Sequence, residues 1–220
     1  MQRGFTFALN EFYHLYSRGT DKRVIFKNAK DYNRFVHLLY LCNGTTPIVY
    51  KTLSRNDILS VERGEHLIDI GAYCLMPNHF HILAHERTKN GISMFMRKLL
   101  TGYSMYFNKR YERTGSLFES AFKARHADTD RYLKYLFAYI HLNPAKILDP
   151  NWRTNINVGR KNIYTYVSTY EYSSFPDYLS KKRQERVILT KNAFPDYFVK
   201  EGDAERNLLD WLTGYAVSKD

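Results

Sequence analysis

Two histidines separated by one residue, His79 and His81, stand in a stretch whose residues alternate as in a β-strand. Side chains alternate across a strand, so both imidazoles would lie on one face, about 6.5–7 Å apart, with Phe80 on the other. Two imidazoles at that spacing can bind one divalent metal ion. The pair alone does not require a metal, because two polar histidines on a half-exposed strand give the same pattern.

A tyrosine and an asparagine four residues apart, Tyr139 and Asn143, lie one turn apart on one face of a predicted helix. That face is opposite the apolar stripe of Leu133, Phe137 and Ile140, so neither residue is needed for the core. The amide oxygen can act as a third, hard metal ligand, and the phenol can reach a group bound to the metal. A tyrosine beside a two-imidazole metal site suits phosphodiester transesterification, in which the phenol attacks phosphorus and forms a phosphotyrosine.

Positive charge is concentrated between the histidine pair and the tyrosine helix. The 220 residues include 33 Lys and Arg against 22 Asp and Glu, a formal net charge of +11. A basic segment with interspersed aromatic residues suits single-stranded nucleic acid, because cations follow the phosphates and rings stack on bases. The predicted DNA-binding residues are Arg97, Lys98, Lys109, Arg110, Arg113, Lys123 and Arg125.

The hydrophobic pattern predicts the elements that must position these residues. Strand-like alternation and helical periods of three and four follow one another along the chain. The predicted order is a strand at 12–18, a helix from 28 to 43, a loop or insertion at 45–64, a hairpin of 66–75 and 79–86, a helix from 91 to near 115, a strand at 116–127, a helix at 130–143 and a short helix at 204–215. This order predicts an α+β fold in which helices pack on an antiparallel sheet.

Composition excludes several classes of protein. Cys42 and Cys74 form no paired motif, which excludes a disulfide scaffold and a four-cysteine zinc site. No apolar run approaches the roughly 18–20 residues of a membrane span, and the first residues contain no signal-peptide core. We therefore expect a cytoplasmic protein that does not bind membranes.

Four stretches together resemble the REP-associated tyrosine transposases, a group of the HUH single-tyrosine transposases of bacterial insertion sequences. The stretches are AYCLMPNHFHILAHE, YFNKRYERTGSLFES, YLFAYIHLNPAK and YEYSSF, and the resemblance covers roughly residues 12–178 in the right order. It implies the HUH endonuclease fold, a ferredoxin-like antiparallel sheet with packed helices. It divides the chain into a catalytic domain at 1–178 and a basic, helical C-terminal extension at 179–220.

The resemblance also implies roles for individual residues. Tyr139 would be the nucleophile, His79 and His81 the metal-binding pair and Asn143 the third ligand of Mg²⁺ or Mn²⁺. The expected substrate is single-stranded DNA, often beside an imperfect palindrome or hairpin, cleaved to a 5′-phosphotyrosine and a free 3′-hydroxyl. Such a protein would be associated with the nucleoid, as a monomer or a homodimer. Related transposases commonly carry Gln at the position of Asn143.

Two other functions fit parts of the same pattern. A hydrolase could bind zinc through His79, His81 and His85, although no acidic residue is placed as its base. A protein that has lost catalysis could still bind DNA hairpins. Tyr135 lies one turn before Tyr139, the spacing of two-tyrosine HUH nucleases, and we interpret it as a packing residue.

Overall fold

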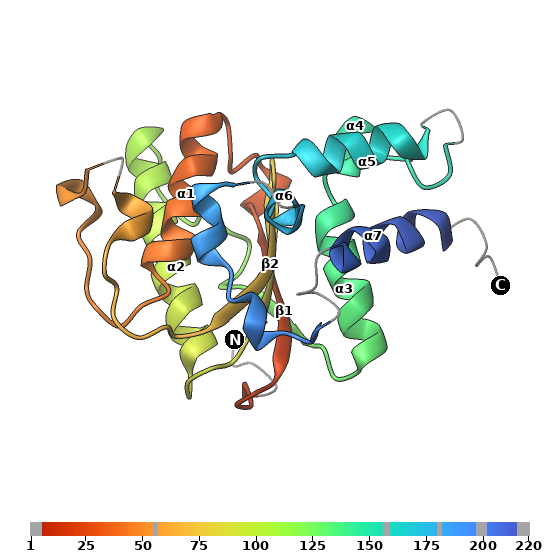
Figure 1. Ribbon diagram of the computed structural model, residues 1–220. Coiled ribbons are helices and arrows are strands. Elements are labelled where there is room, and N and C mark those ends of the chain that lie inside the picture. The colour runs from red at the N-terminus through yellow and green to blue at the C-terminus, as the bar shows by residue number, and fades with distance from the viewer. Residues whose placement is uncertain (1–5, 55–56, 156–158, 180–181, 197–201, 215–220) are drawn as a thin grey trace.

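The centre of the molecule is an antiparallel β-sheet. The computed structural model describes residues 6–54, 57–155, 159–179, 182–196 and 202–214 (Figure 1). Within them, four strands form one sheet in the order β2-β3-β1-β4. The strands are β1 (Phe12–Arg18), β2 (Asp69–Met76), β3 (His79–His85) and β4 (Lys123–His126).

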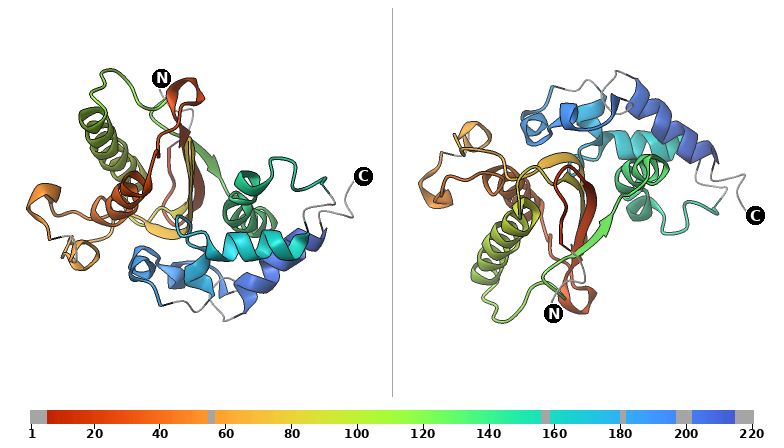
Figure 2. Two further views of the ribbon diagram at one scale, coloured as in Figure 1. Left: turned by 90° about the horizontal axis from the view of Figure 1, so that it is seen from above. Right: turned by 90° about the horizontal axis from the view of Figure 1, so that it is seen from below.

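Helices cover both faces of this sheet. Helices α1 (Ala29–Leu41) and α2 (Gly91–Arg110) lie on one face, and α3 (Asp130–Leu142) lies on the other (Figure 1). Figure 2 shows the same three layers from above and from below. The chain order β-α-β-β-α-β with this strand order is the ferredoxin-like arrangement. The predicted fold class is therefore confirmed.

The alternation of β3 divides the core into two parts. Phe80 and Ile82 pack with α1 and α2, whereas Leu83 packs with α3. All eight residues of β2 are buried, because helices or loops cover the strand on both faces. The imidazole of His81 is on the α3 side, since it alternates with Phe80 and Ile82.

Side-chain caps begin the helices where the sequence predicts them. Asn28 accepts a hydrogen bond from the backbone N–H of Lys30 at the start of α1. Thr129 accepts one from the N–H of Tyr132 at the start of α3. These caps satisfy helix-end donors that would otherwise lack partners.

Two predicted boundaries are wrong. The strand expected at 116–127 is confined to Lys123–His126. Leu117 and Phe118 are both buried, although neighbours in a strand point to opposite faces, so the chain here is a loop packed on the core. Helix α2 ends at Arg110 rather than near 115, because Glu112 has a φ of 49° and the backbone leaves the helical region.

Within the described residues four helices follow α3, and only the last of them was predicted. They are α4 (Ala145–Leu148), α5 (Arg160–Thr169), α6 (Phe175–Tyr178) and α7 (Asp203–Gly214). The part of the chain that the structure describes also contains five short 3-10 turns, η1 (Thr20–Lys22), η2 (Tyr50–Thr52), η3 (Ile58–Ser60), η4 (Gln184–Ile188) and η5 (Lys191–Ala193). None of the described helices is long and apolar enough to span a membrane.

The part of the chain assigned to the C-terminal extension packs on the sheet and on α3. The N–H of Thr190 donates to the carbonyl of Ile70 in β2. The ring of Phe194 lies so close to Gly71 that a Cβ there would meet it at 2.6 Å. Leu208 and Leu212 of α7 join the cluster that contains Leu142 of α3.

A buried ion pair links the two parts of the chain. Asp177 of α6 is 1% exposed, and its carboxylate lies 3.6 Å from Nε of Arg183. Burial raises the pKa of Asp177 to about 6, although Arg183 lowers it. Between pH 4 and 6 the folded protein therefore holds a proton that the unfolded chain has lost. The free energy of unfolding must then fall as the pH rises through this window.

We predict that Asp177→Asn removes this fall, because an amide does not ionise. The free energy of unfolding of the variant relative to wild type should increase by about 2–3 kcal/mol between pH 4 and pH 7. Urea unfolding followed by circular dichroism at both pH values measures it, with the exposed Asp196→Asn as control. A difference that is the same at both pH values would contradict the prediction.

Candidate active site

The strand β3 places His79 and His81 on the sheet face covered by α3. Their ring centroids are 5.0 Å apart with the rings nearly perpendicular. In the neighbouring strand β1, Arg18 lies opposite His79 and Tyr16 opposite His81. Side chains that lie opposite one another in antiparallel strands share a face. The two histidines are therefore flanked by a cation and a phenol.

Asn78 determines which nitrogen of His79 is protonated. The amide Nδ2 of Asn78 donates to the carbonyl of Lys22, so Oδ1 is directed at His79. This oxygen lies 2.6 Å from Nδ1 of His79 and can only accept, so Nδ1 must carry the proton. Nε2 of His79 is then an unprotonated nitrogen suited to bind a metal ion.

His81 has a buried nitrogen without a partner. Its Nδ1 lies 2.8 Å from Nε2 of His14, and its Nε2 is buried with no hydrogen-bond partner in the described part of the chain. Metal binding through Nε2 requires the proton on Nδ1, where His14 is positioned to accept it. A buried unpaired nitrogen of this kind fits a ligand position.

Burial keeps all three histidines neutral. Burial lowers the pKa of His79 to about 4, and Arg18 and Lys146 lower it further. Burial lowers the pKa of His14 to about 3, and Arg125 adds to this effect. Burial also holds the pKa of His81 well below its ordinary value. Neutral imidazole is the form that binds metals. The two histidines of β3 therefore fit a divalent ion.

Helix α3 brings Tyr139 over the histidines. The centroid of its ring lies 5.4 Å from that of His81 and 6.0 Å from that of His14, both edge to face. Leu133, Phe137 and Ile140 of α3 are buried in an apolar cluster with the sheet, and Tyr139 packs against this cluster, which fixes the rotation of the helix. The predicted approach of the tyrosine to the histidine pair is thus present in the geometry.

Asn143 is buried at the end of α3 and is 2% exposed. Its Nδ2 donates to the carbonyl of Tyr139, and its Oδ1 accepts from Nζ of Lys146 at 3.3 Å. The same ammonium lies 5.5 Å from the centroid of the Tyr139 ring. Oδ1 has a second lone pair with which it could bind a metal, beside the ammonium of Lys146 or in its place. Its role as the third ligand stays a prediction.

A cavity of about 470 Å³ opens over Tyr139, His79 and His81. Asn143 does not line it, but Tyr16 and Asn78 do. The basic lining residues are Arg18, Lys22, Lys123 and Lys146, and the acidic one is Glu119, which pairs with Lys123. The cavity is therefore positively charged and suited to an anion.

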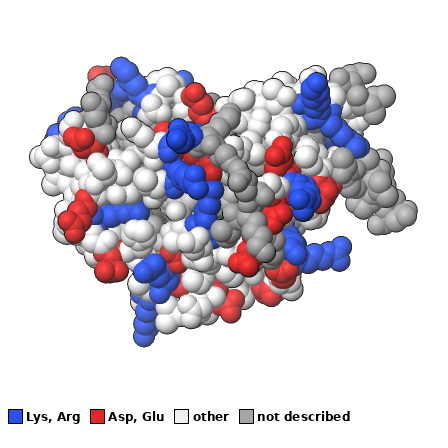
Figure 3. Space-filling view, in the orientation of Figure 1, with Lys and Arg blue, Asp and Glu red and all other residues white. Residues whose placement is uncertain are grey.

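Most of the predicted DNA-binding cations lie elsewhere. Arg97, Lys98, Lys109 and Arg110 belong to α2 and Arg113 follows it, across the sheet from α3. Of the seven, Lys123 alone lines the cavity, while Arg125 stacks on the ring of Tyr132. On the side shown in Figure 3, basic and acidic side chains are interspersed. The basic segment of the sequence is therefore not one continuous track beside the tyrosine.

His85, Tyr135 and His126 make contacts with other side chains and do not belong to a metal site. His85 pairs with Asp69 at 3.0 Å at the far end of β3, and among the described residues no three His, Cys, Asp or Glu side chains are arranged so that they could hold a metal ion together. The zinc site of His79, His81 and His85 is therefore not formed. Tyr135 stacks on Tyr139 at 5.7 Å, and His126 bonds to Glu11.

Several site residues were not predicted from the sequence, and three of them, His14, Arg18 and Lys146, left a signal there. Tyr139, Asn143 and Lys146 are spaced i, i+4 and i+7, so they follow one helical face. His14 and Arg18 occupy alternate positions of the first strand and so share a face. Which strand pairs with the histidine strand, however, is not encoded in any local pattern.

Comparisons with known proteins identify a family and a similar fold. The model of the family "Transposase IS200 like" matches residues 30–143, just over half of the chain. A solved structure of a REP-associated tyrosine transposase bound to a REP hairpin is similar in fold. It has 13% sequence identity and a TM-score of 0.52, and the match covers 84% of this chain and 89% of that one. No curated protein matches.

We predict that metal-free His79 is the Nδ1–H tautomer at pH 7. Long-range ¹H–¹⁵N correlation spectra should then show Nε2 of His79 as an unprotonated nitrogen. Asn78→Ala removes the acceptor and should shift this histidine toward the other tautomer. The His126 ring, remote from Asn78, is the internal control. An imidazolium signal for His79 at pH 7 in the wild-type protein would contradict the prediction.

Proposed function

This chain belongs to the IS200-like transposase family, and we propose that it is a metal-dependent single-strand DNA endonuclease and strand transferase. One observation carries the proposal: a tyrosine and two neutral histidines meet in one positively charged cavity. A phenol is a nucleophile for phosphorus, and imidazoles bind the metal that such chemistry uses. The reaction proposed is phosphodiester transesterification.

The cations of the cavity would bind the scissile region of the strand. Arg18 and Lys22 approach from β1 and the turn after it, and Lys146 approaches from beyond α3. Burial and the nearby Arg153 lower the pKa of Lys146, so its charge is sensitive to its surroundings. A phosphate in the cavity would stabilise that charge and receive hydrogen bonds from it.

Cleavage in this scheme conserves the number of phosphodiester bonds. Oη of Tyr139 bonds to phosphorus while the bond from phosphorus to O3′ breaks. The phenolic proton leaves Tyr139, and the departing O3′ takes up a proton to become a free hydroxyl. The 5′-phosphate stays on the tyrosine, from which the 3′-hydroxyl of another strand can displace it by the reverse reaction.

The proposed cofactor is Mg²⁺ or Mn²⁺. Nε2 of His79 and Nε2 of His81 would hold it, with Oδ1 of Asn143 as the third protein ligand. The bound ion would polarise the scissile phosphate and stabilise charge on its oxygens. The chain's own contribution is to keep both imidazoles neutral and oriented through Asn78 and His14.

We take the substrate to be DNA that contains a hairpin beside the cleaved strand. The structurally similar REP-associated tyrosine transposase is bound to a REP hairpin. The alternative, a protein that binds hairpins without cleaving them, shares this partner. The presence of Tyr139 over both histidines favours the catalytic version.

We predict that Tyr139→Phe abolishes the covalent protein–DNA adduct and leaves hairpin binding nearly unchanged. The wild-type protein, incubated with Mn²⁺ and single-stranded DNA from the flanks of its own gene, should form an adduct that survives denaturing electrophoresis. Tyr135→Phe, one turn away, is the matched control and should keep the adduct. An adduct formed by the Tyr139 variant would show that another residue is the nucleophile. Hairpin binding without any wild-type adduct would favour the silent version.

We also predict that His79→Ala lowers adduct formation at least about a hundredfold, because it removes a metal ligand. The control is His85→Ala, on the same strand but paired with Asp69, which should change the rate little. Adduct yield is measured against Mn²⁺ concentration. Unchanged metal-stimulated cleavage by the His79 variant would contradict the metal site.

A further inference from the structure

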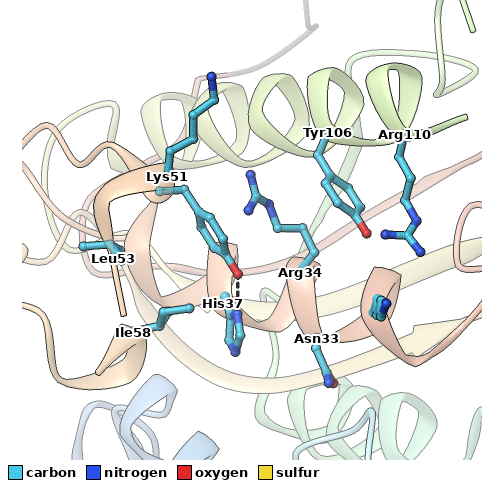
Figure 4. Close-up of a pocket in the computed structure, with 10 residues that line it drawn as sticks. Asn33, Arg34, His37, Lys51, Leu53, Ile58, Tyr106 and Arg110 are labelled. Atoms are coloured by element: carbon cyan, nitrogen blue, oxygen red, sulfur yellow. Dashed lines mark hydrogen bonds between the residues drawn. The ribbon is translucent and has the colours of Figure 1, made fainter. Parts of the chain in front are cut away.

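A second positively charged cavity, of about 520 Å³, lies between α1, α2 and the insertion at 45–64 (Figure 4). Its basic lining residues are Lys30 and Arg34 of α1, Lys51 of η2 and Arg110 of α2. No acidic residue lines it among those described. This cavity is separated from Tyr139 by the sheet, because α1 and α2 cover the opposite face from α3 (Figure 2).

Arg34 is held between two tyrosines. Its guanidinium carbon lies 3.3 Å from the centroid of the Tyr50 ring and 4.9 Å from that of Tyr106. The hydroxyl of Tyr50 is in turn hydrogen-bonded to His37 at 2.7 Å, as the dashed line in Figure 4 shows. The rings therefore fix the plane of the guanidinium and leave its N–H groups to bind a ligand.

The guanidinium of Arg34 has no acceptor among the described residues. Its Nε is buried without a hydrogen-bond partner, and no described carboxylate pairs with Arg34. The nearby buried Asp31 accepts from Tyr106, Tyr111 and the N–H of Lys27, so its oxygens are already occupied. A half-buried cation without a partner is costly, and an anion in the cavity would relieve that cost.

Two further cations are available to the same anion. Lys30 and Lys51 line the cavity and form no ion pair with a described residue. Arg110 lies 3.6 Å from Asp31 at the edge. A planar guanidinium with two flexible ammonium groups matches the oxygens of a phosphate.

We propose that this cavity binds a phosphodiester group of the DNA strand, as a contact separate from the Tyr139 cavity. The inference rests on the proposed function, since it takes DNA as the ligand. One face of the Tyr50 ring is covered by Arg34 and its hydroxyl is engaged by His37. The rings thus support a cation rather than offer a surface for a base. The contact reads the backbone and not the sequence.

Lysine footprinting tests the contact directly. The full-length protein is acetylated with and without a hairpin-containing oligonucleotide, and each lysine is quantified by mass spectrometry. The oligonucleotide should protect Lys30 and Lys51 together with Lys146, and leave the exposed Lys89 unprotected. Protection of Lys146 alone would overturn this inference and leave the proposed function standing. The absence of any DNA binding would overturn both.

A second arm separates a DNA strand from a free nucleotide. Thymidine 5′-monophosphate at the same nucleotide concentration should protect Lys30 and Lys51 much less than the oligonucleotide, because a strand also binds at the other cavity. Equal protection by the mononucleotide would overturn the assignment to a strand and identify a free-nucleotide site instead.

Charge-removing variants give an independent measurement. Arg34→Gln and Lys51→Gln should each weaken oligonucleotide binding, Arg34→Gln by about tenfold. Each should lower the slope of log affinity against log salt by about 0.7–0.9, the value for one phosphate contact. Lys89→Gln removes the same charge and should leave the slope unchanged. Lys51→Gln lies at a surface turn, so its result does not depend on the packing of Arg34. Slopes equal to that of Lys89→Gln would overturn the proposal.

Discussion

The register of β3 between β1 and β2 determines where all of the chemistry lies. Because both faces of the sheet are covered, the strand must bury Phe80 and Ile82 against α1 and α2, and this places His79 and His81 toward α3. A slip by one residue would put both imidazoles in an apolar core and Phe80 under the tyrosine. The apolar packing on one face therefore orients the polar site on the other.

The cations of the site serve two functions. Burial and the cations Arg18 and Lys146 lower the pKa of His79, which keeps its imidazole neutral for a metal ion. The same cations attract a phosphate to the cavity. Asn143 is linked to both functions, because its side-chain oxygen accepts a hydrogen bond from the cation Lys146 and is also the predicted third metal ligand. Movement of Lys146 toward a bound phosphate would release that oxygen.

The sequence predicted the local parts of the site better than their assembly. The spacing of His79 and His81, and the helical face of Tyr139, follow from periods of two and nearly four that any strand or helix must obey. The pairing of Arg18 with His79 depends on strand order, which the family resemblance implied and no local pattern contained. Helix α5 was missed because only Ile163, Val167 and Ser168 of its ten residues are buried, too few for a periodic signal.

The excess of basic residues also has a different distribution in space than along the chain. Tyr103 and Phe107, two of the aromatic residues within the basic segment, are core residues on the buried face of α2 and offer no stacking surface. Of the two rings that hold Arg34, that of Tyr106 comes from α2 and that of Tyr50 comes from the insertion, which is hydrogen-bonded to the end of α1. Asn43 accepts from the N–H groups of Leu67 and Ile68, and Arg63 donates to the carbonyl of Tyr40. Tyr50 and Lys51 therefore belong to a segment that is anchored at both ends. An insertion whose sequence predicts an irregular loop can in this way hold Arg34 in place for a ligand.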